Sequence, residues 1–347
     1  MPINYEVINP NTDVATTKTL LHEVIPLTGT IVSGTYGTFP NDDNIKNYSH
    51  GMFQSVYDYP YLSSSANHIF DISVGFDESS PLSGSTDAVQ EKKKINMYNQ
   101  FSQVMLGYTG SANRVRLFES DLQLDESAAD VMKEVVFVNL SRLLTKDQIK
   151  KGSVSLTVGT ASWADPFSGT KTFVDDEATN NGGTLNTAGG DYGILTGSDG
   201  VGGIVFYQAG VMVLTSSIWE GTTDFYSAST GIRDFDNQLV SGSISGSADA
   251  LRHRLQNLQF NNTTEINSSV YFCRASHNKF NYSSNPTYLS SSAIRVKNQN
   301  RDNPPVSYIT TIGLYNSQNE LLAVAKLSEP LKKDPTNELT LRVRLDY

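Results

Sequence analysis

Apolar and polar positions alternate along much of the chain, and this alternation predicts strands. In segment 339–347 the apolar residues are Leu, Leu, Val, Leu and Tyr, and the polar residues between them are Thr, Arg, Arg and Asp. Successive side chains of a strand point to opposite faces, so a period of two predicts a strand with one buried face. Segments 306–315 and 320–327 are rich in β-branched and aliphatic residues, and residues 317–319 predict a turn between them. We therefore expect a β-hairpin followed by a C-terminal strand.

Two roles for the C-terminal strand fit this pattern equally well. It closes the sheet of its own chain, or it contacts a neighbouring molecule. Arg342 and Arg344 lie on the polar face, which makes them candidates for a contact with a partner. The predicted buried face consists of Leu339, Leu341, Val343 and Leu345.

Other segments carry the signals of helices. In the first of them, 95–107, apolar residues recur at helical spacing. Ser127 and Thr145 stand at the head of two more, where a hydroxyl group can accept a bond from a backbone amide of the first turn. Gln148 completes a capping box after Thr145, and Gly152 is a suitable residue to end that helix. The predicted helices cover 95–107, 127–135, 145–151 and 247–258.

Residues 161–203 differ from the rest in composition. They are rich in aspartate and glycine, with nine glycines between 182 and 203. We interpret this stretch as a long loop or projecting hairpin, inserted between two β-rich segments, 1–160 and 204–347, that form one domain. The predicted fold is mainly β within the α+β class. It has antiparallel sheets arranged like a sandwich, two to four short helices and a Gly-rich projecting loop.

Composition and charge narrow the function. Charged residues make up 18% of the chain, below the roughly 25% of a typical soluble domain. Polar uncharged residues take their place, which suits hydrogen-bonded surfaces between subunits. The formal net charge of −10 opposes nucleic-acid binding, because phosphates need a basic surface. No apolar stretch is long enough for a transmembrane helix, and the first residues lack the features of a signal peptide. We expect neither nucleic acid nor membrane among the partners.

The candidate chemical motifs are weak. The Gly-rich run 197–203 lacks the Lys-Ser/Thr pair of a phosphate-binding loop, and no serine stands in a G-x-S-x-G motif. The histidines and the single cysteine, Cys273, do not follow metal-site spacing. The acidic clusters 175–177 and 234–237 could bind a hard cation but lack the calcium-loop pattern, so we interpret them as solvated loop acids. A carboxylate pair for glycoside cleavage stays a less favoured alternative. We predict no catalytic, cofactor or metal site.

Aromatic residues gather in two segments, 48–61 and 272–288. Large rings bury much area at low entropic cost, so they often anchor interfaces, although packing within the chain's own core is an equally good explanation for any one ring. The candidate interface residues are Tyr57, Tyr59, Tyr61, Phe280, Tyr282, Tyr288, Arg342 and Arg344.

Four segments resemble parts of known proteins. These are YPYLSSSANHIFDISVG (59–75), KKKINMYNQFSQVMLGY (92–108), FCRASHNKFNYSSNPTY (272–288) and PVSYITTIGLYNSQNELLAVAKLSEPLKKD with LRVRLDY (305–347). They are similar to structural proteins of large contractile-tailed bacteriophages, especially marine myoviruses. The similar segments include both halves of the chain.

The resemblance implies a structural protein of the virion, in the tail, baseplate or neck, assembled in the host cytoplasm. Its partners would be copies of itself and other virion proteins. The resemblance brings no catalytic residues with it. Two alternatives are a receptor- or glycan-binding module at the tail tip, which would contact the host surface, and a capsid decoration protein.

Overall fold

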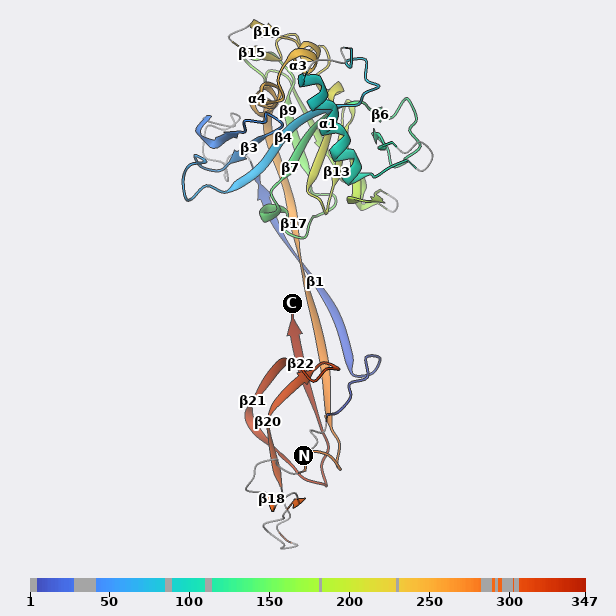
Figure 1. Cartoon of the computed structure of the whole chain (residues 1–347), viewed down its shortest axis with the longest axis vertical. Helices are drawn as coiled ribbons and strands as arrows, with labels where there is room; N and C mark the ends of the chain where they lie inside the picture. Colours follow the sequence, from blue (N-terminus) through green and yellow to red (C-terminus); the bar gives the residue numbers. More distant parts are fainter. Residues whose placement is uncertain are drawn as a thin grey trace. The chain divides into compact units, whose positions relative to one another are not determined.

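The chain divides into two compact units. The computed structural model describes residues 5–27, 42–84, 89–109, 114–180, 183–228, 231–281, 289–290, 293–294, 302 and 306–347 (Figure 1). Unit 1 consists of Met1–Leu20 and Glu265–Tyr347, and unit 2 is Leu21–Thr264. The described residues are mainly β, with large antiparallel sheets and four α-helices, which confirms the predicted class. The boundary lies inside strands β1 (Val14–Pro26) and β17 (Leu255–Ala275), so the division differs from the predicted one at 160 and 204.

Unit 2 is built on an antiparallel sheet. Part of the strand order is β17, β9, β10, β12, β13, β14, β7, β4, β3 and β2. The bounds are β2 (Ile45–Asn47), β3 (Gln54–Tyr57), β4 (His68–Phe76), β7 (Glu134–Leu140), β9 (Ser155–Gly159), β10 (Thr170–Val174), β12 (Gly190–Gly197), β13 (Gly200–Phe206) and β14 (Val211–Thr215).

The central strands are buried on both faces. In β14, Val211 and Val213 belong to one apolar cluster, whereas Met212 and Leu214 belong to another. A continuous apolar run is the pattern expected of such a strand. Both clusters consist only of residues from unit 2.

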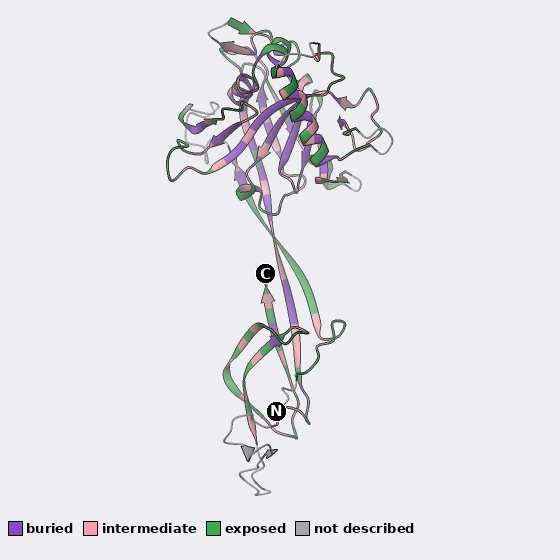
Figure 2. Cartoon of the chain, viewed as in Figure 1, coloured by how far each residue is buried: buried purple, intermediate pink, exposed green. Residues whose placement is uncertain are grey.

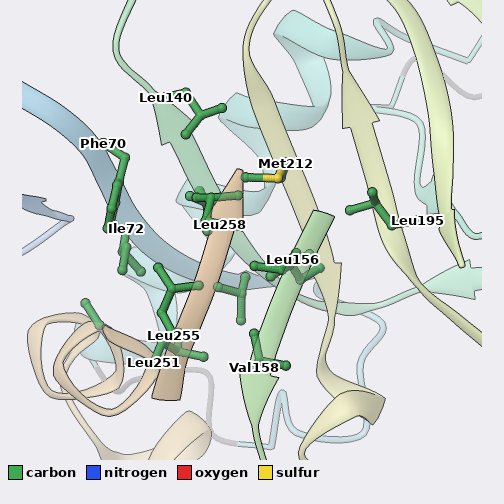
Figure 3. Packing of buried hydrophobic residues seen from close by; sticks show 14 of the residues in the cluster. Phe70, Ile72, Leu140, Leu156, Val158, Leu195, Met212, Leu251, Leu255 and Leu258 are labelled. Atoms are coloured by element: carbon green, nitrogen blue, oxygen red, sulfur yellow. The ribbon is translucent and has the colours of Figure 1, made fainter. Parts of the chain in front are cut away.

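The larger cluster joins strands that are far apart in the sheet order. In Figure 3, Leu258 of β17 and Leu156 of β9 lie among Ile72 of β4, Leu140 of β7 and Met212 of β14. The sheet therefore curves around a shared core, as in a sandwich. Helix α4 (Ile244–Arg254) adds further apolar residues to this cluster.

Helix α1 (Val89–Met105) packs closely against β4 and includes most of the helix predicted at 95–107. A Cβ atom at Gly75 would lie 2.8 Å from the Lys94 carbonyl oxygen, so only glycine allows this approach. The Tyr98 hydroxyl donates to the Met132 carbonyl at 3.0 Å and accepts the Phe118 N–H at 3.0 Å. These bonds fix the helix to the second cluster.

Two predicted helices are wrong. Residues 127–135 form a turn followed by β6 (Val131–Met132) and the start of β7, because β-branched residues there pair with neighbouring strands. Residues 145–151 contain the end of α2 (Arg142–Thr145) and then β8 (Gln148–Ile149), which pairs with β17. Lys146 has φ 56°, which ends the helix where the capping box predicts a beginning. Tertiary pairing outweighs the local helix signals in both cases.

The helix predicted at 247–258 lies too late in the sequence. Helix α4 begins after Ser243, whose hydroxyl accepts the Gly246 N–H at 3.0 Å, and it ends at Arg254. Ser247 is buried inside the helix and donates to the Ser243 carbonyl at 3.1 Å. The leucines at 255 and 258 belong to β17 and still face the core, as the apolar pattern predicted.

Residues 161–203 do not form a projecting loop. They contribute β10, β11 (Leu185–Thr187), β12 and the start of β13, and β12 and β13 form a hairpin within the main sheet. The glycines serve packing: a Cβ at Gly202 would lie 2.3 Å from the Phe173 ring. Glycine here permits close contact in the sheet interior.

Unit 1 contains β22 (Leu339–Asp346), which pairs with β17 over the register Leu339↔Ala275 to Asp346↔Ser268. On the other side of β17, the Phe272 N–H donates to the Asp13 carbonyl at 2.8 Å, next to β1. Strands β20 (Ser307–Tyr315) and β21 (Leu321–Lys333) form a separate hairpin, as predicted. The remaining elements are β5 (Phe118–Glu119), β15 (Tyr226–Ala228), β16 (Gly231–Arg233), β18 (Leu289–Ser290), β19 (Ala293–Ile294), α3 (Phe235–Ser241), η2 (Asp42–Asn44), η3 (Asp176–Thr179) and η4 (Ser216–Ile218).

Candidate interaction surfaces

Unit 1 has almost no apolar core among its described residues. Unit 2 contains 49 buried apolar residues, whereas unit 1 contains four. Figure 2 shows the contrast between the buried strands of unit 2 and the exposed and half-buried strands of β20 and β21. The four residues are Val270, Ala275, Leu314 and Val343. Burial of apolar area is the main favourable contribution to folding, so these strands need additional cover.

The turn of the β20–β21 hairpin is well specified. The Asn316 side-chain oxygen accepts the N–H groups of Gln318 at 2.9 Å and Glu320 at 2.8 Å. Asn319 has φ 65°, a conformation that asparagine tolerates better than most residues. The pairing shifts between Leu314 and Tyr315. This turn fixes which side chains face solvent at the start of β21.

Five exposed apolar residues lie on or beside this hairpin, and we call them the hairpin patch. It consists of Tyr5, Tyr315, Leu321, Leu322 and Val324, each between 38% and 68% exposed. The rings of Tyr5 and Tyr315 lie 5.0 Å apart. Tyr315 and Leu321 both border Gly313, which pairs with Val324 across the hairpin. A single exposed leucine is ordinary, whereas several exposed apolar residues on one hairpin make this surface a candidate for an interface.

Strand β22 has the predicted alternation but is less buried than expected. Val343 is buried, whereas the leucines at 339, 341 and 345 are only half-buried. The prediction of four buried residues on this face is therefore wrong for the three leucines, because few apolar residues of unit 1 cover this strand. Arg342 and Arg344 are exposed on the opposite face, and Arg344 bonds Asp346 at 2.8 Å and the Ser268 hydroxyl at 3.2 Å.

The structure brings two of the three predicted tyrosines of unit 2 together. The rings of Tyr57 and Tyr61 lie 6.4 Å apart, and Tyr57 also contacts the His68 ring at 5.6 Å. Tyr59 is exposed. Burial raises the pKa of Tyr57. Polar residues beside these tyrosines connect β3 to β4, and the sequence pattern did not reveal them. Asp71 accepts a bond from the Ser55 hydroxyl at 2.5 Å and interacts with the His68 ring at 2.8 Å.

This Ser-His-Asp grouping differs from a hydrolase triad. In a triad the imidazole accepts the serine proton and the carboxylate orients the imidazole. Here the Ser55 hydroxyl donates to the same Asp71 oxygen that the His68 ring contacts. The grouping joins β3 to β4, and the Ser55 hydroxyl bonds the carboxylate in place of the imidazole that a triad requires.

Only one of the three candidates from segment 272–288 can be described. Phe280 is 38% exposed with φ 54°, and its carbonyl accepts the Ser307 hydroxyl at 2.7 Å. Tyr282 and Tyr288 lie outside the described residues.

One aspartate of each acidic cluster is structural, whereas Asp176, Glu177 and Asp236 are exposed, as expected of solvated acids. Asp175 is fully buried and accepts bonds from the N–H groups of Val154 at 2.7 Å and Gly152 at 2.8 Å, and from the Tyr207 hydroxyl at 3.0 Å. Burial raises the pKa of the Asp175 carboxyl, against the effect of these bonds. Asp234 caps α3 by accepting the Asn237 N–H at 2.8 Å. Both clusters show specific backbone bonding that composition alone does not reveal.

A cavity of about 550 Å³ lies in unit 2 between the 129–134 segment and the start of α3. Carboxylates and one lysine line it, and Ser80 bonds the Glu134 carboxylate. The described residues hold no group of three or more His, Cys, Asp or Glu side chains arranged to bind a metal ion. The cavity therefore offers polar walls without an arrangement that points to a particular ligand.

Charge is unevenly divided between the units. Unit 2 contains 15 basic and 27 acidic residues, a formal net charge of −12. Unit 1 contains 11 basic and 9 acidic residues, a formal net charge of +2. Unit 2 repels further copies of itself, whereas unit 1 approaches a copy of itself with little electrostatic cost.

No protein-family model, curated protein sequence or solved structure matches this chain. Among the described residues, every helix is too short or too polar to cross a membrane.

Proposed function

We propose that this chain is a structural protein of a bacteriophage virion, in the tail, baseplate or neck, and that it acts through repeated protein contacts without catalysis. The observation that carries the proposal is the contrast between the units: 49 buried apolar residues in unit 2 and four among the described residues of unit 1. Strands with so little cover are typical of a subunit that completes its burial in an assembly. The four segments similar to phage structural proteins supply the kind of assembly.

The proposal predicts that the chain is a stoichiometric component of intact particles. Particles of a phage that encodes it should be purified by density gradient, and their proteins quantified by mass spectrometry. Antibodies against the purified chain, detected by immunogold electron microscopy, should label the tail or neck. Labelling confined to the capsid exterior would favour a decoration protein, and absence of the chain from purified particles would overturn the proposal.

A second candidate function, glycan or receptor binding, is favoured by the tyrosines at 57, 59 and 61. The second and third of these rings are 51% and 38% exposed, close to Leu62, which is 85% exposed. Exposed rings are a common platform for apolar sugar faces. A glycan array probed with the full chain and with Tyr59→Ala plus Tyr61→Ala tests this function. Binding lost in the double variant would support it.

A further inference from the structure

We propose that the hairpin patch is the contact surface for a second copy of this chain, packed around a two-fold axis that passes near Ala323. The inference rests on the proposed function only in expecting repeated self-contacts.

The patch is large enough to form the centre of an interface. Aromatic residues bury about 150–250 Å² each, and two of the five residues are tyrosines. Together with the three smaller aliphatic side chains, the half-exposed patch presents roughly 400 Å² of mostly apolar surface. A standard interface buries about 800 Å² on each partner, with an apolar centre and a polar rim. Exposed Thr310, Thr311 and Lys326 supply the polar rim on this hairpin.

The patch is complementary to itself. Glu320 and Lys326 lie at its two ends, each three residues from Ala323, and both are exposed. One oxygen of the Glu320 carboxylate accepts a bond from the Asn316 side-chain amide at 2.7 Å. A two-fold axis near Ala323 reverses the direction of β21 in the second copy, so Glu320 of each copy lies opposite Lys326 of the other. The same operation places Leu322 against Val324. A symmetric contact requires this kind of self-complementary surface.

The charges of the two units also favour a second copy of this chain as the partner of the hairpin patch. Contact between two copies of unit 1 brings together units with a small formal net charge of +2 each. The described residues of the acidic unit 2 present no comparable cluster of exposed apolar residues on adjacent strands. An apolar patch is best covered by another apolar patch. A second copy supplies one of equal size.

Sedimentation velocity of the purified full chain, across about 1–100 µM, tests the contact. The wild type should dimerise or form a larger symmetric oligomer. Leu322→Asp plus Val324→Asp should weaken association by more than about 100-fold, because it places unpaired charges in the contact. Leu62→Asp plus Val104→Asp, at two exposed apolar positions of unit 2, is the matched control and should associate like the wild type.

A charge exchange tests the two-fold geometry without depending on apolar residues. Glu320→Lys alone and Lys326→Glu alone should each weaken association about three- to ten-fold, because each brings like charges together. The double variant Glu320→Lys plus Lys326→Glu restores opposite charges and should recover the wild-type affinity. Circular dichroism spectra and melting curves of every variant establish that the fold is retained.

Several results would overturn the inference. They are a wild type that stays monomeric at 100 µM, a unit 2 control that dissociates as strongly as the patch variant, and a charge exchange without recovery. These results leave the proposed function standing if the chain is found in particles. Conversely, a dimer that depends on the patch, together with absence from particles, would refute the virion assignment and keep this inference.

Discussion

Removing strand β22 should unfold unit 1 and spare unit 2. The change is deletion of residues 339–347. In the intact chain this strand pairs with β17 along its whole length and contributes one buried valine and three half-buried leucines. No residue of β22 belongs to either apolar cluster of unit 2.

The magnitude follows from this burial. Full burial of a large aliphatic side chain contributes about 1.5–3 kcal/mol, so a half-buried leucine contributes about 1 kcal/mol and Val343 about 2 kcal/mol. The strand as a whole then contributes about 5 kcal/mol, at the lower end of the total stability of a domain. Unit 1 has only three other buried apolar residues among those described, and it should not stay folded after this loss.

Differential scanning calorimetry of the full and shortened chains is the assay. We expect the shortened chain to lose the unfolding heat of unit 1, and with it the proposed self-association, while the transition of unit 2 keeps its midpoint within about 2 °C. Arg342→Ala plus Arg344→Ala, on the exposed face of the same strand, should leave both transitions unchanged. A fall of more than about 5 °C in the unit 2 midpoint would refute the reasoning, because it would show that β22 supports the core of unit 2.

Three further predictions concern unit 2 and metal dependence. Asp175→Asn should lower the free energy of unfolding of unit 2 in urea by about 2–4 kcal/mol, because asparagine keeps one oxygen and turns an N–H donor toward one of the two backbone N–H groups that the carboxylate accepts. Burial raises the pKa of this carboxyl, so the wild type should gain stability relative to the variant as the pH falls through the folded pKa toward 3.8. Lys94 is buried against carbonyls at the end of α3, and burial lowers its pKa to about 8. Between pH 8 and 10.5 only the unfolded chain keeps the proton, so the free energy of unfolding of the wild type should rise there by on the order of 2–3 kcal/mol relative to Lys94→Met. Equal pH profiles of the two proteins would contradict this. A chelator should leave the melting temperature unchanged within about 1 °C, and a fall of several degrees would reveal a bound cation.

Strand patterns near the C-terminus were predictable because side-chain alternation is a local property. The hairpin at 306–327 and the strand at 339–346 follow from period-two patterns and one turn. The helices at 127–135 and 145–151 were not predictable in the same way. Capping signals in those segments are real, but β7 and β8 gain more from pairing with β14 and β17 than a short helix would provide.

The candidate surfaces were predictable only in part. Exposure of Arg342 and Arg344 follows directly from the alternation of β22. The hairpin patch depends on the shift in pairing next to Tyr315 and on the approach of Tyr5, a residue about 310 positions away in the sequence. The consecutive leucines at 321 and 322, directly after a turn, were the only local sign. Composition also could not distinguish a solvated aspartate from Asp175, whose partners come from two segments, 152–154 and Tyr207.

Strand β1 has a consequence for handling and for synthesis of the protein. Ten of its thirteen residues are exposed, and in the described sheet its one neighbour is β17. A long strand with an open edge is a template for the strands of other molecules, and growth from such edges produces fibres and precipitates. Lys18 and Pro26 in this strand are residues that slow such growth. Concentrated preparations of the chain should therefore precipitate through this edge. Under the proposed function, subunits made faster than they are incorporated would be lost in the same way, so the timing of synthesis would determine how much usable protein remains.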